Sequence, residues 1–152
     1  MIFCVSAFDA PATPGAYVLA LRLDAPLDVR VGKISATLPA GDYLYCGSAR
    51  GPGGLRARLA RHMRPQKRPH WHIDQLTAVA SVLGAFVHKD GDECALNAAL
   101  AHLPIPVAGF GSSDCRRCAA HLRLWPKDAA LPSRWENARK AAESHLPLEG
   151  EG

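Results

Sequence analysis

The sequence lacks several features that would assign it to a specialised class of protein. No apolar run approaches the roughly 20 residues that a membrane helix needs, so we expect no membrane anchor. The segment from Met1 to Asp9 has no basic start and no long apolar centre, which argues against a signal peptide. The five cysteines are odd in number and irregularly spaced, which argues against a secreted disulfide framework. These absences predict a cytoplasmic protein.

One further absence concerns phosphate binding. The glycine-rich stretch at residues 47–54 is not followed by Gly-Lys-Ser/Thr, so it is not the phosphate loop of a nucleotide hydrolase. What is present is the balance of an ordinary globular domain, with 152 residues, 48% hydrophobic and 21% charged. We expect a functional domain over residues 1–125, followed by a C-terminal helix and frayed tail over residues 126–152.

Alternating strand-like and helix-like segments predict the fold class. Apolar and aromatic runs between turn residues predict strands at 16–23, 43–47 and 81–88, with an extended region at 29–38 and a short edge strand at 122–125. Leucine and methionine spacing predicts a helix over 55–64, and periodic or capping signals predict helices at 70–78, 93–102 and 133–144. The result is an α+β fold, with a small antiparallel three-stranded sheet flanked by helices and a C-terminal extension.

Acidic residues are absent between Tyr43 and Ile73. The same stretch contains seven of the chain's 18 lysine and arginine residues, together with three histidines: Arg50, Arg56, Arg58, Arg61, Arg64, Lys67 and Arg68, with His62, His70 and His72. A local positive field of this kind concentrates polyanions and speeds their encounter. The stretch therefore favours nucleic acid as a partner, with a solvated basic helix face as the alternative.

Arg58 and His62 give the predicted helix two side chains suited to phosphate chemistry. They are four residues apart, so they share one face, beside the stripe of Leu55, Leu59 and Met63. The guanidinium of Arg58 stays charged and offers a fork of donors to phosphate oxygens. His62 can move a proton near neutral pH. Taken alone, the pair is also explained as two surface side chains.

Two short motifs join this pair in an ordered set. Gly15-Ala16-Tyr17 opens the first predicted strand, and Tyr45-Cys46-Gly47 closes a later strand just before the helix. In this order the chain resembles the GIY-YIG nuclease superfamily, whose Gly-Ile-Tyr and Tyr-Ile-Gly strands precede a helix carrying an arginine. The superfamily also places a glutamate on a later helix, and Glu93 is the fitting candidate.

Further marks are similar to the small, stand-alone Uri-type endonuclease branch of that superfamily. They are Trp71-His72-Ile73-Asp74-x-Leu76, then the run from Gly109 to Cys115, then His121-Leu122. The resemblance extends from about Gly15 to Trp125. Each motif is weak alone, but the ordered set is specific.

The resemblance implies metal-dependent hydrolysis of a nucleic-acid phosphodiester, with one Mg²⁺ or Mn²⁺ ion held by Glu93. It implies that Tyr45 takes a proton from the attacking water and that Tyr17 positions the nucleophile or the phosphate. Arg58 would stabilise charge in the transition state, and His62 is the second candidate for proton transfer. Because a phenol titrates near pH 10, a tyrosine base needs help from a nearby positive charge or from the metal.

Side chains around this constellation are expected to contact nucleic acid, with DNA favoured over RNA. These are Ser48, Arg50, Arg56, Arg61 and His72. Ser48 stands where some superfamily members have a lysine that activates the tyrosine. Ser113 and Asp114 stand in the region where many members have an asparagine near the metal. These departures motivate an alternative function, a catalytically weak or inactive nucleic-acid-binding module on the same fold. The sequence carries no signal for an oligomeric state.

A cysteine and histidine cluster invites a third interpretation. Cys115-x-x-Cys118-x-x-His121 places three soft ligands close together, which zinc accepts. A fourth ligand could come from Cys94, Cys46 or another histidine. Structural zinc sites more often show two separated ligand pairs, and only one pair is evident here. Structural Zn²⁺ at Cys115, Cys118 and His121 is therefore a minor alternative, in which the chain is a zinc-stabilised interaction domain.

Overall fold

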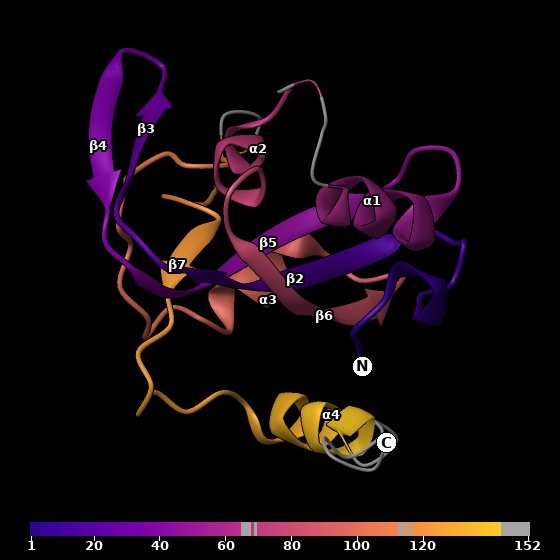
Figure 1. Ribbon diagram of the computed structural model, residues 1–152. Helices are drawn as coiled ribbons and strands as arrows, with labels where there is room; N and C mark the ends of the chain where they lie inside the picture. The colour runs from indigo at the N-terminus through magenta and orange to yellow at the C-terminus, as the bar shows by residue number, and fades with distance from the viewer. Residues whose placement is uncertain (65–67, 69, 113–114, 116, 144–152) are drawn as a thin grey trace, which may run out of the picture.

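A computed structural model describes residues 1–64, 68, 70–112, 115 and 117–143 (Figure 1). Lys67 of the basic stretch, Ser113, Asp114 and the C-terminal residues 144–152 lie outside the described residues. The described chain forms a mixed α+β fold around one antiparallel sheet, as the alternation of segments predicts. No helix in this described part of the chain is long and apolar enough to cross a membrane.

The main sheet has five strands in the order β1-β6-β2-β5-β7. Its centre consists of β2 (Gly15–Leu23), which pairs along its whole length with β5 (Gly41–Ala49) and on its other side with β6 (Ser81–Lys89). The edges are β1 (Ile2–Cys4) and β7 (Leu122–Leu124). The expectation of a three-stranded sheet is therefore wrong. The edge strand expected at 122–125 is present as β7, but β1 has three residues, too few to show a period of two in sequence.

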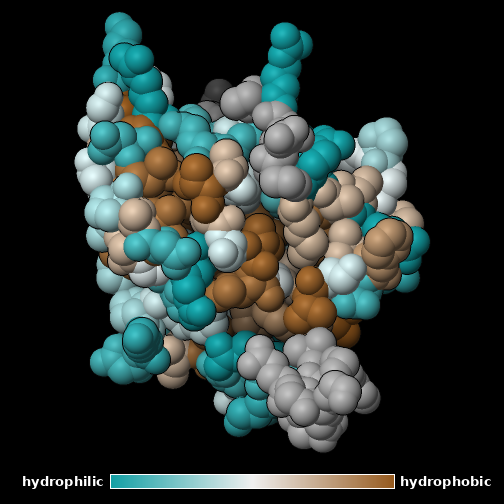
Figure 2. All heavy atoms as spheres, in the orientation of Figure 1, coloured by the Kyte–Doolittle hydropathy of each residue, from teal (hydrophilic) through white to brown (hydrophobic). Residues whose placement is uncertain are grey.

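A separate hairpin projects from the sheet at the upper left of Figure 1, formed by β3 (Leu27–Val31) and β4 (Ile34–Leu38). The sequence predicts one extended region there. Gly32 divides it, because its φ of +61° lies in the left-handed region that a tight turn uses. In the same orientation, Figure 2 shows hydrophilic side chains at this projecting end and apolar side chains gathered nearer the middle of the face.

Helices cover both faces of the sheet. One face packs under α1 (Gly54–Met63) and α2 (His72–Thr77), and the other under α3 (Glu93–Ala98) and α4 (Ser133–Glu143). A short 3₁₀ helix, η1 (Ala7–Asp9), lies against α1. Because side chains alternate along β2, the two cores take alternate residues: the first face buries Tyr17, Leu19 and Leu21, and the second buries Ala16, Val18 and Ala20.

Two helices differ from the sequence prediction in ways that affect the site. The helix predicted over 93–102 ends at Ala98, and turns lead on to Leu103. On α1 the buried stripe consists of Leu55, Leu59 and His62, while Met63 is only half-buried. His62 is 1% exposed, so it lies inside the fold and not on a flanking surface. The reason is the partner that it meets there, which is described next.

Candidate functional site

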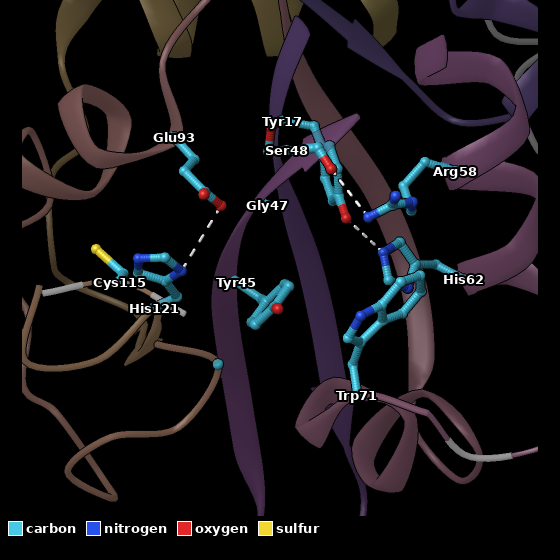
Figure 3. A pocket seen from close by; sticks show the side chains of 11 residues that line it. Tyr17, Tyr45, Gly47, Ser48, Arg58, His62, Trp71, Glu93, Cys115 and His121 are labelled. Carbon is cyan, nitrogen blue, oxygen red and sulfur yellow. Dashed lines mark hydrogen bonds and ion pairs between the residues drawn. The ribbon is translucent and has the colours of Figure 1, made fainter. Parts of the chain in front are cut away.

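An open pocket lies where β2, β5 and α1 meet the start of α3 and the segment before β7 (Figure 3). All five predicted catalytic side chains line it, and so does Ser48. The lining residues are Tyr17, Tyr45, Gly47, Ser48, Arg58, His62, Trp71, Glu93, Gly111, Cys115 and His121. Figure 3 shows Arg58 and His62 on one side, Glu93 and His121 on the other, and the two tyrosines between them. The pocket thus joins positive, aromatic and acidic groups from segments far apart in sequence.

Tyr17 and His62 form a buried pair at the base of one side of the pocket. The Tyr17 hydroxyl lies 2.6 Å from His62 Nε2. Tyr17 pairs across the sheet with Gly47, and a Cβ on Gly47 would overlap the ring and hydroxyl of Tyr17. The glycine of the Tyr-Cys-Gly motif is therefore required because the ring of the Gly-Ala-Tyr tyrosine lies across it. Burial raises the pKa of Tyr17, although the neighbouring Arg58 acts in the opposite direction.

Tyr45 lies on the same face of the sheet as Tyr17, with its ring edge-on to His62 and Phe110. A Cβ on Gly111 would lie 2.6 Å from a ring carbon of Tyr45. The loop therefore passes so close to the phenol that only glycine fits at this position. Burial raises the pKa of Tyr45 well above 10, and the nearby Tyr17 and Glu93 raise it further. Both phenols are therefore protonated at neutral pH.

Arg58 points across the mouth of the pocket from α1. Its guanidinium donates to the backbone oxygen of Ser48 at 2.9 Å and lies 4.4 Å from the ring centre of Trp71. The guanidinium of Arg61 lies over the same ring at 4.2 Å. Contact with an aromatic face holds a cation without neutralising it. Arg58 is thus positioned beside the pocket with its charge intact.

Arg61, a predicted nucleic-acid contact, makes an internal ion pair. It forms a two-pronged ion pair with the buried carboxylate of Asp74, with distances of 2.7 and 3.0 Å. The same carboxylate accepts from the backbone N–H groups of His70 and Trp71. Burial alone would raise the pKa of Asp74, but these donors lower it to about 2. The ion pair fixes the start of α2 against α1, and with it Trp71.

Glu93 approaches the pocket from the opposite side. It is the first residue of α3, and its side chain remains 30% exposed. Among the described residues that line the pocket, it is the one carboxylate. Its Oε2 lies 3.7 Å from Nδ1 of the buried His121 (Figure 3). The N-cap of α3 is Asp92, which accepts from the Cys94 backbone N–H and so fixes the first turn that presents Glu93.

The predicted nucleic-acid contacts are only partly brought together. Ser48 lines the pocket, and Arg50 lines an adjoining groove with Ser48 and Glu93. Arg56 lies elsewhere, donating to the backbone oxygen of Ala10 at 2.9 Å. Its position follows from the helical period, because two residues along α1 separate it from Arg58 by about half a turn.

His72 does not line the pocket. Its Nδ1 accepts from the Gly111 backbone N–H at 2.9 Å, so it holds the loop that approaches Tyr45. Trp71 was missed among the site residues, although an aromatic residue within a basic stretch is a signal for contact with arginine.

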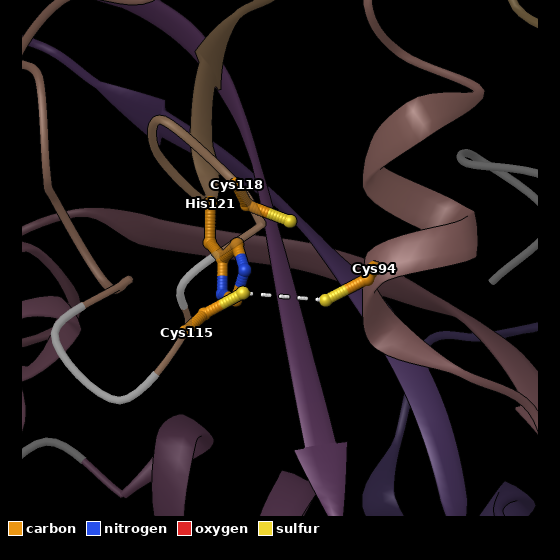
Figure 4. A group of neighbouring side chains, drawn as sticks. All are labelled: Cys94, Cys115, Cys118 and His121. Atoms are coloured by element: carbon orange, nitrogen blue, oxygen red, sulfur yellow. Dashed lines mark hydrogen bonds between the residues drawn. The ribbon is translucent and has the colours of Figure 1, made fainter.

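A second cluster, drawn in Figure 4, shares Cys115 and His121 with the lining of the pocket. Ligand atoms of Cys94, Cys115, Cys118 and His121 all lie within 4.8 Å of one another, an arrangement that could hold a metal ion. The sequence identified three of these residues. Cys94 is the added member, and it is the first of the three alternatives that the sequence offered for a fourth ligand. Cys46 is instead fully buried in the core under α3, where burial raises the pKa of its thiol.

Comparison with known proteins gives the family. The family model described as "Domain of unknown function DUF123" matches residues 16–144. Because the match covers most of the chain, the protein belongs to this family, which is GIY-YIG-like. No curated protein and no solved structure matches the chain significantly. The family description names no activity.

Proposed function

We propose that the protein is a divalent-metal-dependent endonuclease of the Uri-type branch that hydrolyses nucleic-acid phosphodiesters, with DNA as the preferred substrate. The observation that supports this most is the convergence of Tyr17, Tyr45, Arg58, His62 and Glu93 on one open pocket. These residues come from two strands and two helices. Together they supply the groups that phosphoryl hydrolysis needs: a cation for the phosphate, a proton path and a metal-binding carboxylate.

Glu93 is the residue that would hold the metal. Its partly exposed carboxylate on the pocket wall fits Mg²⁺ or Mn²⁺, since these ions accept one or two protein carboxylates and keep water and phosphate oxygens as their other ligands. When bound, such an ion withdraws charge from the phosphate and lowers the pKa of water. All other steps fall to the protein's own side chains.

The Tyr17–His62 pair is the best-supported proton path. With Nε2 of His62 unprotonated, the Tyr17 hydroxyl donates to it, so Tyr17 can take a proton from the attacking water while passing its own to His62. The new bond joins the water oxygen to phosphorus, the opposite P–O ester bond breaks with its electron pair on the leaving oxygen, and that oxygen takes a proton from solvent. Tyr45 was the leading candidate from sequence. Tyr45 meets His62 through an edge-on ring contact, whereas the Tyr17 hydroxyl lies 2.6 Å from His62 Nε2, and this difference favours a positioning role for Tyr45.

Arg58 would bind the phosphate and stabilise the charge that develops on its oxygens. Its guanidinium is held by Ser48 and Trp71, so little conformational entropy is lost when the phosphate binds. Trp71 also offers a ring edge beside the pocket on which a base or sugar can pack. Arg50 extends the positive surface along the adjoining groove.

The test is a cleavage assay on labelled single- and double-stranded DNA and RNA with Mg²⁺ or Mn²⁺. Wild type should cleave, and Glu93→Ala and Arg58→Ala should each reduce the rate by about a thousandfold or more. Glu93→Ala should keep nucleic-acid affinity, because the carboxylate is not a phosphate contact. A wild type that binds in a salt-sensitive way but cleaves no substrate would instead support the binding module, for which Ser48 in place of a lysine is the motivating feature.

A further inference from the structure

The Cys94, Cys115, Cys118 and His121 cluster joins two segments that are far apart in the sequence. Cys94 lies in the first turn of α3, and the other three lie in the segment that leads into β7. No helix or strand occurs among the described residues between Ala98 and Leu122. So long a stretch without regular structure is unusual in a compact domain unless something fixes it. Three thiols and an imidazole in one place are suited to do so.

The spacing of the cluster fits a tetrahedral zinc ion. Ligands at about 2.3 Å for sulfur and 2.0–2.1 Å for nitrogen around one centre are separated from each other by roughly 3.5–3.8 Å. The sulfur atoms of Cys94 and Cys115 are 3.4 Å apart, and all four ligand atoms lie within 4.8 Å of one another. A contraction of about 1 Å at the widest pair completes the tetrahedron. Three thiolates and one imidazole select zinc, whereas Mg²⁺ selects oxygen ligands such as that of Glu93.

His121 supplies an independent sign of a ligand. Its Nε2 is buried and has no hydrogen-bond partner among the residues that the structure describes. Leaving a buried polar atom without a partner costs about 1–3 kcal/mol, so such atoms are uncommon in folded proteins. Its other ring nitrogen, Nδ1, faces Glu93. Coordination through Nε2 satisfies the first nitrogen and leaves the proton on the second.

The backbone next to Cys115 is a further feature that favours a bound metal ion. Interactions with the backbone N–H groups of Arg117 and Cys118 lower the pKa of the Cys115 thiol. Donors of this kind stabilise a thiolate, which is the form that binds metal.

We propose that Cys94, Cys115, Cys118 and His121 bind one structural zinc ion, and that His121 thereby positions Glu93. The zinc joins the start of α3 to the segment that carries Gly111, so it fixes two walls of the pocket relative to β5. Nδ1 of the coordinated His121 keeps its proton and faces the Glu93 carboxylate, an arrangement that orients a carboxylate beside a metal centre. The zinc assignment is independent of nuclease activity, and the positioning of Glu93 rests on the proposed function.

Metal analysis of the full chain, purified in reductant and exchanged into metal-free buffer, tests the zinc site. Wild type should hold about one zinc per chain, and replacement by Co²⁺ should give the intense visible spectrum of a tetrahedral thiolate centre. Chelation should lower the melting temperature. Cys118→Ser should lose the ion, whereas Cys4→Ala, a buried cysteine outside the cluster, should retain it. A folded wild type that takes up neither zinc nor Co²⁺, or that contains a Cys94–Cys115 disulfide, would overturn the proposal.

His121→Cys tests the positioning of Glu93, because it preserves four zinc ligands and removes the imidazole. We expect zinc content to remain near one per chain and Mn²⁺ affinity at Glu93 to fall about tenfold or more, measured by titration calorimetry. Unchanged Mn²⁺ affinity with zinc retained would remove the positioning role. If wild type binds zinc but no Mn²⁺, the proposed nuclease function fails while the zinc site stands.

Discussion

The two sides of the pocket are built in different ways. On one side, Tyr17, Arg58 and His62 come from a central strand and a helix, and each has a partner within that frame. On the other side, Glu93 and His121 lie at the first turn of a short helix and at the end of a segment without regular structure. The first side is rigid because strand pairing and core packing define it. The second side depends on cross-links between segments.

This difference has a functional consequence. The side that would bind phosphate is preorganised, so its electrostatics are fixed before a substrate arrives. On the side that would bind the metal, the position of Glu93 would depend on the ion bound by the cysteine and histidine cluster. The two sides should therefore respond differently to mutation, and the following predictions run from the largest expected effect to the smallest.

Asp74→Asn should produce the largest loss of stability. It leaves Arg61 without its carboxylate and weakens the acceptor for two backbone N–H groups. Breaking a buried ion pair in this way costs about 3–5 kcal/mol of unfolding free energy. Urea unfolding at pH 7 measures the loss. Asp28→Asn, at an exposed carboxylate on β3, is the matched control and should change stability by less than about 1 kcal/mol.

The Asp74 carboxylate should also make the free energy of unfolding depend on pH. Its pKa in the folded protein is about 2, below the ordinary value of 3.8. Between these values the unfolded chain binds more protons than the folded one, so stability falls as the pH decreases. The contribution, about 2 kcal/mol, is complete above pH 4 and lost as the pH approaches 2. The stability difference between wild type and Asp74→Asn should shrink over that window. A constant difference would contradict this origin.

Tyr17→Phe compares the two tyrosines. It removes the hydroxyl that contacts His62 and should reduce the cleavage rate about a hundredfold, in the range of general acid–base effects. Nucleic-acid affinity should change little. Tyr45→Phe is the counterpart on the same face and should cost less than tenfold if it only positions the substrate. Single-turnover cleavage rates distinguish the two tyrosines. A larger loss of rate in Tyr45→Phe would identify Tyr45 as the general base.

Gly47→Ala tests why the Tyr-Cys-Gly motif ends in glycine. The added methyl would overlap the Tyr17 ring, so either the ring or the strand must shift. We expect a loss of about 1–3 kcal/mol, as for other overpacked cores, and a displaced Tyr17–His62 pair. Gly51→Ala is the control, because open space surrounds its would-be methyl. If both variants match wild type in thermal unfolding, the close approach at Gly47 is relaxed in solution.

The regular side of the pocket was largely predictable from sequence. Strand boundaries, the helix carrying Arg58 and His62, and the motif glycines all have local periods or turn signals. The burial of His62 could not be predicted from the sequence. The helical stripe that begins with Leu55 and Leu59 can continue equally well to Met63 as to His62. Only the cross-strand position of Tyr17 determines which residue faces inward. The edge strand expected at 122–125 is present as β7, whereas β1 was missed because pairing, not composition, defines a three-residue strand.

The irregular side was less predictable for a related reason. The Cys-x-x-Cys-x-x-His run was visible, but its fourth member, Cys94, is far away in sequence and joins it only through the fold. Arg61 and His72 show the same limit. Their charge and position predict nucleic-acid contacts, and the fold adds internal partners that the sequence does not show: Asp74 for the Arg61 guanidinium and the Gly111 N–H for Nδ1 of His72.

The smallest expected effect is a difference in nucleic-acid affinity between Arg50→Ala and Arg56→Ala. Both arginines lie in the basic stretch and were predicted to contact nucleic acid, but only Arg50 lines the groove beside Ser48 and Glu93. Removing one phosphate contact lowers affinity a few-fold and reduces the salt slope by about one. Arg50→Ala should do both in fluorescence anisotropy at several salt concentrations, with catalysis-dead Glu93→Ala as the background. Arg56→Ala should match that background, because its guanidinium is held by Ala10 on another surface. An equal loss in both variants would mean that nucleic acid follows overall charge and not the groove.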